Sequence, residues 1–243
     1  MIALFTDFGL AGPYMGQMRA VLVEQAPGIP IVDLMADAPR FNPRASAYLL
    51  AACSAGFPDG TVFLCVVDPG VGGTRRPVAL KAGGMWFVGP DNGLMSIVAR
   101  QRGCSVAIEL PEPQGPVAPT FHGRDLFAPA VAKLATGESP RGKQVKPQEI
   151  DRADWPDDLP EVVYIDSYGN VITGIRAKRC SFSAVIEWHG RRVVPARTFA
   201  DVAPGEAIYY ANSSGLLEIA VREGSAAELF SASVGSPVGQ DVE

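Results

Sequence analysis

Strand-like and helix-like segments alternate along the first half of the chain, and no other feature of the sequence limits the fold as strongly. Apolar runs at residues 2–6, 29–34 and 61–67 have the length and composition of buried strands, whereas residues 14–25 and 43–55 show helical spacing. Strands that alternate with helices of this length are typical of βαβ units, in which the strands run parallel and helices cover the sheet. The sequence therefore predicts an α/β fold with an N-terminal Rossmann-like α/β/α sandwich and a mostly parallel sheet.

The pattern changes after residue 137. Residues 137–160 contain four prolines, many charges and few large apolar side chains, which is typical of a linker between domains. Short β-rich runs separated by turn residues then follow at residues 162–165, 171–175, 184–188, 191–194, 207–210 and 217–221. Such runs predict a small antiparallel β-barrel or sandwich, of which we favour the barrel. We expect two domains, at residues 1–150 and 151–243.

Composition and charge argue against several classes of protein. The 243 residues carry a net charge of −5 and no basic tract, so we expect no nucleic-acid partner. No apolar run reaches the length of a membrane span, and the N-terminus begins directly with a strand instead of a signal peptide. The four cysteines are widely spaced without a CxxC pair, which argues against a zinc knuckle. We expect a soluble, reduced, cytoplasmic protein without a membrane partner.

An aspartate at the end of a buried strand is the first candidate for chemistry. The apolar run of residues 62–67 ends in Asp68-Pro69-Gly70-Val71-Gly72-Gly73, and Arg75 follows shortly after. Open α/β sheets bind their ligands at the carboxyl ends of strands, and several glycines in one turn let the backbone approach a bound molecule closely. Asp68 alone is explained slightly better as a turn former before Pro69, but the glycines and Arg75 favour a ligand site. The loop lacks Gly-Lys-Ser/Thr and is therefore not a P-loop.

Asp7 and His122 are two further candidates. Asp7 follows the first strand, where a carboxylate commonly accepts hydrogen bonds from a ribose diol, although an Asx turn or helix cap explains it equally well. GxGxxG is missing after this strand, which disfavours a standard dinucleotide-binding fold. His122 is one of two histidines and lies in Phe121-His122-Gly123-Arg124-Asp125, just before a predicted helix. A lone histidine is more often structural than catalytic, but this position makes His122 a better candidate than average.

Two turns in the C-terminal half carry polar and aromatic groups. Asp166-Ser167-Tyr168-Gly169-Asn170 offers a carboxylate, an aromatic face and an amide, a set that suits a purine stacked on Tyr168 and hydrogen-bonded by Asn170. An ordinary hairpin turn explains the same residues. Asn212-Ser213-Ser214-Gly215 is either a turn or a small polar cradle for an anion.

Taken together, these motifs resemble the S-adenosylmethionine hydroxide adenosyltransferase family, which is related to enzymes that fluorinate or chlorinate the same substrate. No single motif is decisive, but six match in order over nearly the whole chain, at residues 6–9, 67–75, 89–93, 121–125, 166–170 and 212–215. The resemblance implies the two-domain architecture described above. It also implies a homotrimer, with substrate held between the N-terminal domain of one subunit and the C-terminal domain of its neighbour.

The resemblance further implies roles for individual residues. Asp68, Arg75 and His122 match the water-activating set of the family. For the ribose diol the resemblance implies Asp7, with Phe8 beside it. For the adenine it implies Asn170 at the edge, Tyr168 stacked near it and Phe199 as a wall of the pocket. For the methionine end it implies Asp166 at the ammonium, and Ser213 and Ser214 at the carboxylate. Some relatives carry arginine where this chain has Ser214, so hydroxyls and backbone would hold the carboxylate here.

The halogenating relatives differ from this chain at informative positions. They carry tyrosine in place of Asp68, threonine in place of Val71 and serine in place of Gly123. A halide site needs small hydroxyl donors, and the negative charge of Asp68 would repel a halide. The branch of the family that uses water is therefore the better match.

We expect hydrolysis of S-adenosyl-L-methionine by in-line attack of activated water at C5′, which gives adenosine and L-methionine. The sulfonium is already a good leaving group, so the enzyme has to place the water and make it nucleophilic. No metal or redox cofactor is expected. Three alternatives stay open: a halogenase of the same family, a non-catalytic sensor that binds S-adenosylmethionine or adenosine, and a metal-dependent hydrolase built on Asp7, Asp68 and His122.

Overall fold

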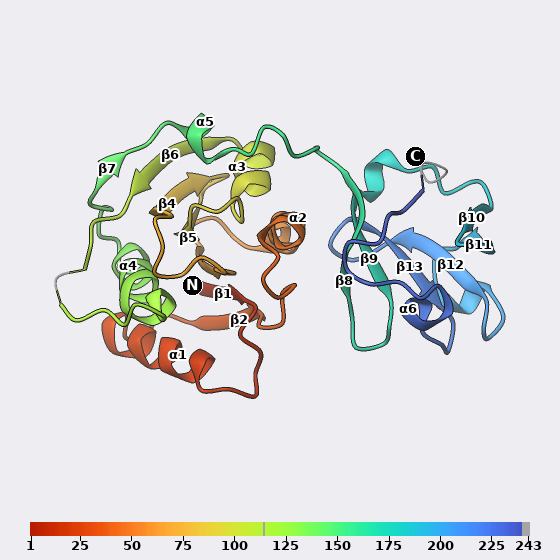
Figure 1. The fold of residues 1–243 in the computed structure, drawn as a ribbon, viewed down its shortest axis with the longest axis horizontal. Helices are drawn as coiled ribbons and strands as arrows, with labels where there is room; N and C mark the ends of the chain where they lie inside the picture. Colours follow the sequence, from red (N-terminus) through yellow and green to blue (C-terminus); the bar gives the residue numbers. More distant parts are fainter. Residues whose placement is uncertain (114, 240–243) are drawn as a thin grey trace. The chain divides into compact units, whose positions relative to one another are not determined.

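The computed structural model describes residues 1–113 and 115–239 and divides into two compact units, Met1–Ala153 and Asp154–Glu243 (Figure 1). Within the described residues, no helix combines the length and the apolar character needed to cross a membrane.

The first unit is built on a seven-stranded sheet in the order β2-β1-β3-β5-β4-β6-β7. Its strands are β1 (Ile2–Thr6), β2 (Ile31–Met35), β3 (Val62–Val66), β4 (Pro77–Ala82), β5 (Met85–Pro90), β6 (Cys104–Glu109) and β7 (Lys143–Gln144). β2, β1, β3 and β5 run parallel to one another, and β4, β6 and β7 join by antiparallel pairing.

Helices cover both faces of this sheet. They are α1 (Tyr14–Gln25), α2 (Pro43–Cys53), α3 (Ser96–Arg102) and α4 (Ala128–Ala135), and α1 packs on α4 while α2 packs on α3 (Figure 1). Ile2 and Leu4 of β1 share one core with α1 and α4, whereas Ala3 and Phe5, which point to the other face, are also fully buried. The predicted α/β/α fold class is confirmed.

Two features of the sheet were missed by the sequence analysis. Gly83 and Gly84 both have positive φ, 54° and 79°, as a two-residue type I′ turn requires, so β4 and β5 form an antiparallel hairpin. The second is β6, which follows Gly103 and pairs with β4. The hairpin reverses the chain direction, so β4 runs against both of its neighbours, β5 and β6, in an otherwise mostly parallel sheet.

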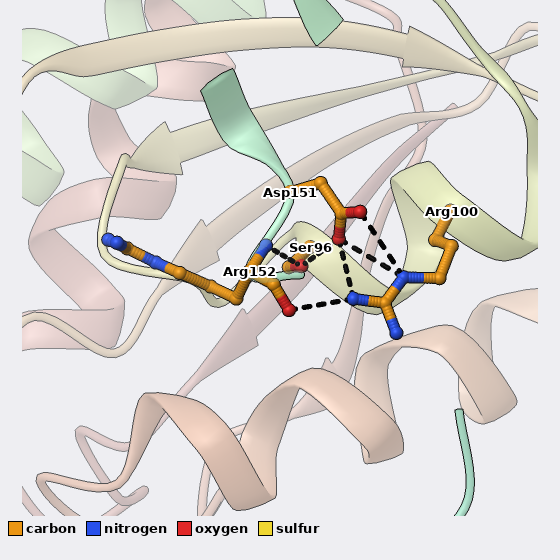
Figure 2. A network of polar contacts seen from close by, with 4 residues as sticks. All are labelled: Ser96, Arg100, Asp151 and Arg152. Carbon is orange, nitrogen blue, oxygen red and sulfur yellow. Dashed lines mark hydrogen bonds and ion pairs between the residues drawn. The ribbon is translucent and has the colours of Figure 1, made fainter. Parts of the chain in front are cut away.

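Much of the segment predicted as a linker belongs to the first unit. β7 pairs with β6, and the short helix α5 (Pro147–Ile150) leads into Asp151. Figure 2 shows Asp151 accepting hydrogen bonds from Arg100 Nη2 at 2.7 Å and Ser96 Oγ at 2.9 Å. Arg100 Nη2 also donates to the carbonyl of Arg152 at 2.7 Å. These contacts fix the chain to α3 up to Arg152, so the linker prediction is wrong for residues 143–152.

The second unit is a curled six-stranded sheet in the order β10-β11-β12-β13-β9-β8. Its elements are β8 (Leu159–Ile165), β9 (Val171–Arg176), β10 (Ile186–Trp188), β11 (Arg191–Pro195), β12 (Ala207–Ala211), β13 (Leu216–Val221) and the short helix α6 (Ala226–Leu229). All neighbours pair antiparallel except β11 and β12, which are parallel because residues 196–206 cross over between them. The small β-rich domain is confirmed, with this one departure from an all-antiparallel sheet.

Candidate functional site

Asp68, Arg75 and His122 form one hydrogen-bonded group in the first unit. Asp68 lies just beyond the carboxyl end of β3, and Arg75 lies just before β4. Arg75 donates from Nη2 and Nε to Asp68 Oδ2 at 2.6 and 2.9 Å, and from Nε to Oδ1 at 3.1 Å. The same Nη2 lies 2.8 Å from His122 Nδ1. The side chains of Asp68 and Arg75 are only 4% and 11% exposed, so this is a largely buried ion pair.

The glycine-rich turn is what returns Arg75 to Asp68. The amide of Val71 donates to the Asp68 carbonyl at 3.2 Å, and the amide of Gly73 donates to the Gly70 carbonyl at 3.0 Å. Gly72 has a φ of 78°, and a Cβ at this position would lie 2.7 Å from the carbonyl oxygen of Pro119. Only glycine fits there, because the turn needs both the left-handed conformation and the close approach.

The hydrogen bond to Arg75 fixes the tautomer of His122. A guanidinium only donates hydrogen bonds, so Nδ1 accepts and the neutral ring carries its proton on Nε2. Burial, and then the charge of Arg75, lower the pKa of His122, against the opposing charges of Asp68 and Asp125. His122 is therefore neutral at neutral pH and presents Nε2–H as a donor.

Asp7 and Phe8 lie at the same end of the sheet, just past β1, which is the parallel neighbour of β3. One oxygen of Asp7 accepts from the amide of Phe41 at 3.1 Å. Burial raises the pKa of Asp7, with a smaller contribution from the charge of Asp68, while the Phe41 amide and Arg40 oppose this rise. Because β1 and β3 are parallel neighbours, Asp7 and Asp68 both lie beyond the carboxyl ends of adjacent strands.

An aromatic cluster of Phe8, Tyr14 and Phe121 borders this end of the sheet. The three rings contact one another with centroids 5.3 to 5.8 Å apart. A Cβ at Gly123 would lie 3.1 Å from Met18 Sδ and 3.5 Å from both Phe8 and Phe121. The cluster therefore leaves little room for a side chain at position 123.

The remaining predicted residues lie in the second unit. Asp166 accepts from the amides of Tyr168 and Asn170 and from Asn170 Nδ2, each at 2.9 Å. Gly169 closes this loop with a φ of 80°. Asn170 is buried, whereas Tyr168 is 79% exposed. The loop thus presents a free aromatic face beside a fixed carboxylate and amide.

The turn at residues 212–215 is organised by Asn212. Its Oδ1 accepts from the amides of Ser214 at 3.0 Å and Leu216 at 2.9 Å. Ser213 is exposed and Ser214 is half-buried. Phe199, at the start of a short 3-10 helix, packs edge-on against Tyr210 of β12 with centroids 5.6 Å apart.

The predicted site residues thus fall into two groups. Asp7, Phe8, Asp68, Arg75 and His122 belong to the first unit, and Asp166, Tyr168, Asn170, Phe199, Ser213 and Ser214 belong to the second.

Phe41, Tyr210 and Glu218 were not singled out from the sequence. Phe41 is 76% exposed, has a φ of 57° that is unusual for a non-glycine residue, and donates its amide to Asp7. Nothing in its sequence neighbourhood signals this. Tyr210 and Glu218 sit inside β-rich runs whose apolar pattern concealed them.

The guanidinium of Arg75 occupies the place between Asp68 and His122. A metal ion held by these two side chains would have to displace it, and its positive charge would oppose a metal cation. Across residues 1–113 and 115–239, no three His, Cys, Asp or Glu side chains are arranged to hold a metal ion.

Comparison with known proteins gives a consistent family. Residues 2–143 match the SAM hydroxide adenosyltransferase N-terminal domain, and residues 160–239 match the C-terminal domain of the same family. An (R)-S-adenosyl-L-methionine hydrolase of Thermus thermophilus is 40% identical over 98% of this chain and 98% of its own. A fluorinase of Nocardia brasiliensis is more distant, at 27% identity over 98% of this chain and 95% of its own.

A solved structure of an uncharacterized conserved protein from Thermotoga maritima shares the fold. Its TM-score is 0.88 at 32% identity, and the match covers 97% of this chain and 98% of that one.

Proposed function

The chain belongs to the SAM hydroxide adenosyltransferase family, and we infer that it is an enzyme that hydrolyses S-adenosyl-L-methionine to adenosine and L-methionine. The observation that carries this inference beyond the family is the Asp68–Arg75–His122 group, which joins an acid, a cation and a neutral imidazole in one buried hydrogen-bonded set. A protein that merely binds S-adenosylmethionine has no use for such a set.

We propose that this group places one water in line with the C5′–S bond. The water oxygen forms the new bond to C5′, the C5′–S bond breaks, and its electron pair neutralises the sulfonium to give the thioether of methionine. Because the leaving group needs no proton, catalysis rests on positioning, which is worth roughly 7–11 kcal/mol for a well-oriented nucleophile. His122 Nε2–H would donate to one lone pair of the water oxygen, which orients the water so that its other lone pair faces C5′.

The proton of the water has one plausible acceptor in this group. His122 Nδ1 already accepts from Arg75, so the imidazole has no free basic nitrogen. Asp68 Oδ2 accepts two hydrogen bonds from Arg75, whereas Oδ1 accepts only the longest one, at 3.1 Å. We propose that Asp68 Oδ1 takes the proton and that Arg75 keeps both partners in place.

The other predicted residues would hold the substrate. We propose that Asp7 accepts hydrogen bonds from the ribose diol, Tyr168 and Phe199 enclose the adenine, and Asn170 meets its edge. Asp166 would pair with the methionine ammonium, and Ser213 and Ser214 would face the carboxylate. No metal or redox cofactor is part of this proposal.

Because the two groups lie in different units, we further propose a cytoplasmic homotrimer whose active sites combine the first unit of one chain with the second unit of a neighbour.

The test is product analysis in labelled water. Purified protein is incubated with S-adenosyl-L-methionine in H₂¹⁸O, once with a chelator and once with chloride or fluoride. Each reaction should give adenosine labelled at the 5′ oxygen and an equal amount of methionine. A halogenated adenosine as the major product would reassign the chain to the halogenating branch. Folded, ligand-bound protein that yields no adenosine would make it a sensor, and loss of activity with the chelator would favour a metal-dependent hydrolase.

A further inference from the structure

Glu218 is a buried carboxylate to which the site described above gives no task. It lies in the middle of β13 and is 6% exposed. Taking a carboxylate out of water is costly unless it is paired or hydrogen-bonded. No lysine, arginine or histidine in the described part of the chain forms an ion pair with it.

The two oxygens of Glu218 are taken by two neutral donors. The hydroxyl of Tyr210, its cross-strand partner on β12, donates to Oε1, and Asn212 Nδ2 donates to Oε2 at 3.1 Å. Burial raises the pKa of Glu218, these two hydrogen bonds lower it, and the charge of Asp166 raises it further. Glu218 pairs with Ile172 of β9, two residues beyond Asn170, which donates to Asp166.

Each donor belongs to a different part of the proposed substrate site. Asn212 uses its other side-chain atom, Oδ1, to hold the amides of Ser214 and Leu216, which shapes the turn that carries Ser213 and Ser214. Tyr210 packs against Phe199. Because Oε2 accepts from the Asn212 NH₂ group, it favours the orientation of the amide in which Oδ1 faces the turn and accepts from the two backbone amides.

We propose that Glu218 is a positioning residue for the methionine end of the substrate and acts through Asn212. It orients the Asn212 amide so that Oδ1 organises the turn at residues 212–215, and this turn holds the methionine carboxylate. The proposal rests on the proposed function, but concerns only how the amino-acid end is held. It assigns Glu218 no contact with substrate and no part in activating water.

The variant Glu218→Gln tests this relay because it keeps the size of the side chain. If the glutamine oxygen still accepts from Tyr210, its NH₂ group faces the NH₂ group of Asn212 and that hydrogen bond is lost; the reversed amide keeps the Asn212 bond only by turning the Tyr210 hydroxyl from a donor into an acceptor. We expect KM for S-adenosyl-L-methionine to rise about tenfold, the effect of one hydrogen bond to a charged group. kcat and the inhibition constant of adenosine, which lacks the methionine end, should each change by less than about threefold.

A second substitution should restore the hydrogen bond with its polarity reversed. In Glu218→Gln with Asn212→Asp, the glutamine NH₂ donates to one aspartate oxygen while the other still accepts from the amides of Ser214 and Leu216. KM should return to within about threefold of the wild-type value. Asn212→Asp alone places two carboxylates against each other and should raise KM as strongly as Glu218→Gln.

The outcomes separate this proposal from the proposed function. If the wild-type protein hydrolyses S-adenosyl-L-methionine and both single variants keep its KM, Glu218 has no positioning role. The same holds if Glu218→Gln weakens adenosine and substrate equally, or if the double variant shows no recovery. Should Glu218→Gln fail to fold, Asn212→Asp and the double variant decide by the same criteria. A wild-type protein that does not act on the substrate overturns the proposed function instead.

Discussion

In the first unit the Asp68 carboxylate is held by a guanidinium through three hydrogen bonds of 2.6 to 3.1 Å, whereas in the second unit Asp166 and Glu218 accept only from neutral amides and a phenol. Both regions bury negative charge, but only the first supplies its own cation. In the first region the charge of Asp68 is thus already neutralised by Arg75 without a ligand. In the second region Asp166 has no cationic partner among the described residues, and the proposed substrate brings an ammonium.

This difference separates chemistry from recognition. Changes in the Asp68–Arg75–His122 group should act on turnover and on the stability of the first unit. Changes around Asp166 should act on substrate affinity. The predictions below follow this division, and each can break it.

Arg75→Ala should have the largest effect. It removes the cation from a largely buried pair and leaves Asp68 unpaired, which costs about 3–5 kcal/mol of unfolding free energy. Turnover should fall at least about 10³-fold, because Asp68 and His122 lose the group that joins them. Arg75→Lys should recover little, since an ammonium cannot reproduce the paired contacts of the guanidinium.

The matched control for Arg75 is Arg19→Ala, which removes another arginine–aspartate pair from the same unit. Arg19 and Asp33 are 44% and 26% exposed, so this change should cost less than about 1 kcal/mol and leave turnover intact. Chemical denaturation and steady-state rates measure both effects. Equal losses of unfolding free energy and of turnover in the two variants would show that the Arg75–Asp68 pair contributes no more than an exposed ion pair.

Asp166→Asn should act on affinity and not on turnover. The amide oxygen can still accept from the amides of Tyr168 and Asn170, but its NH₂ group faces Asn170 Nδ2 and carries no charge for an ammonium. Substrate binding should weaken about tenfold or more, the range for a hydrogen bond to a charged group. Calorimetry and kcat measured on one preparation check this, and a fall in kcat at unchanged affinity would reverse the division.

Acidification should reduce kcat through His122. A proton on Nδ1 removes the acceptor for Arg75 Nη2, so the active form is neutral. Burial and Arg75 lower the pKa of His122 below about 6.5, the usual histidine value. As pH falls, kcat should therefore stay constant until the pH is below about 6.5, and then decrease about tenfold for each further pH unit. Asp7, whose pKa is raised by burial, should affect KM in the acidic range instead.

The lowered pKa of His122 also predicts how the unfolding free energy changes with pH. The unfolded chain takes up the His122 proton first as pH falls, because the pKa of the folded form is lower. His122 therefore contributes stability above the unfolded pKa that is lost as pH falls through the folded one. Acid titration of the unfolding free energy of wild type against His122→Asn measures it.

Local sequence was sufficient to find the parts of the fold and site that depend on neighbours in the chain. The strand ends, the glycine turn before Arg75 and the histidine before a helix are all local signals, and the structure brings Asp68, Arg75 and His122 together. The antiparallel hairpin was missed although Gly83-Gly84 marks it, because the alternation of strands and helices was given more weight.

Residues that depend on pairing across strands could not be found in this way. Glu218 is a single acid in an apolar run, and its partner Tyr210 is fixed only by the register of β12 on β13. Phe41 reaches Asp7 from a loop 34 residues away. Neither contact leaves a local pattern, since both arise from tertiary packing.

The most direct test of the central claim compares His122→Ala, Asp68→Asn and Asp7→Ala by calorimetric binding of S-adenosyl-L-methionine and by single-turnover rates. The first two should lose about two to four orders of magnitude in rate, the range for lost acid–base help, with little change in affinity. Asp7→Ala should instead lose tenfold or more in affinity, about the effect of one charged hydrogen bond. Wild-type rates in both His122→Ala and Asp68→Asn would contradict the assignment of water activation to this group.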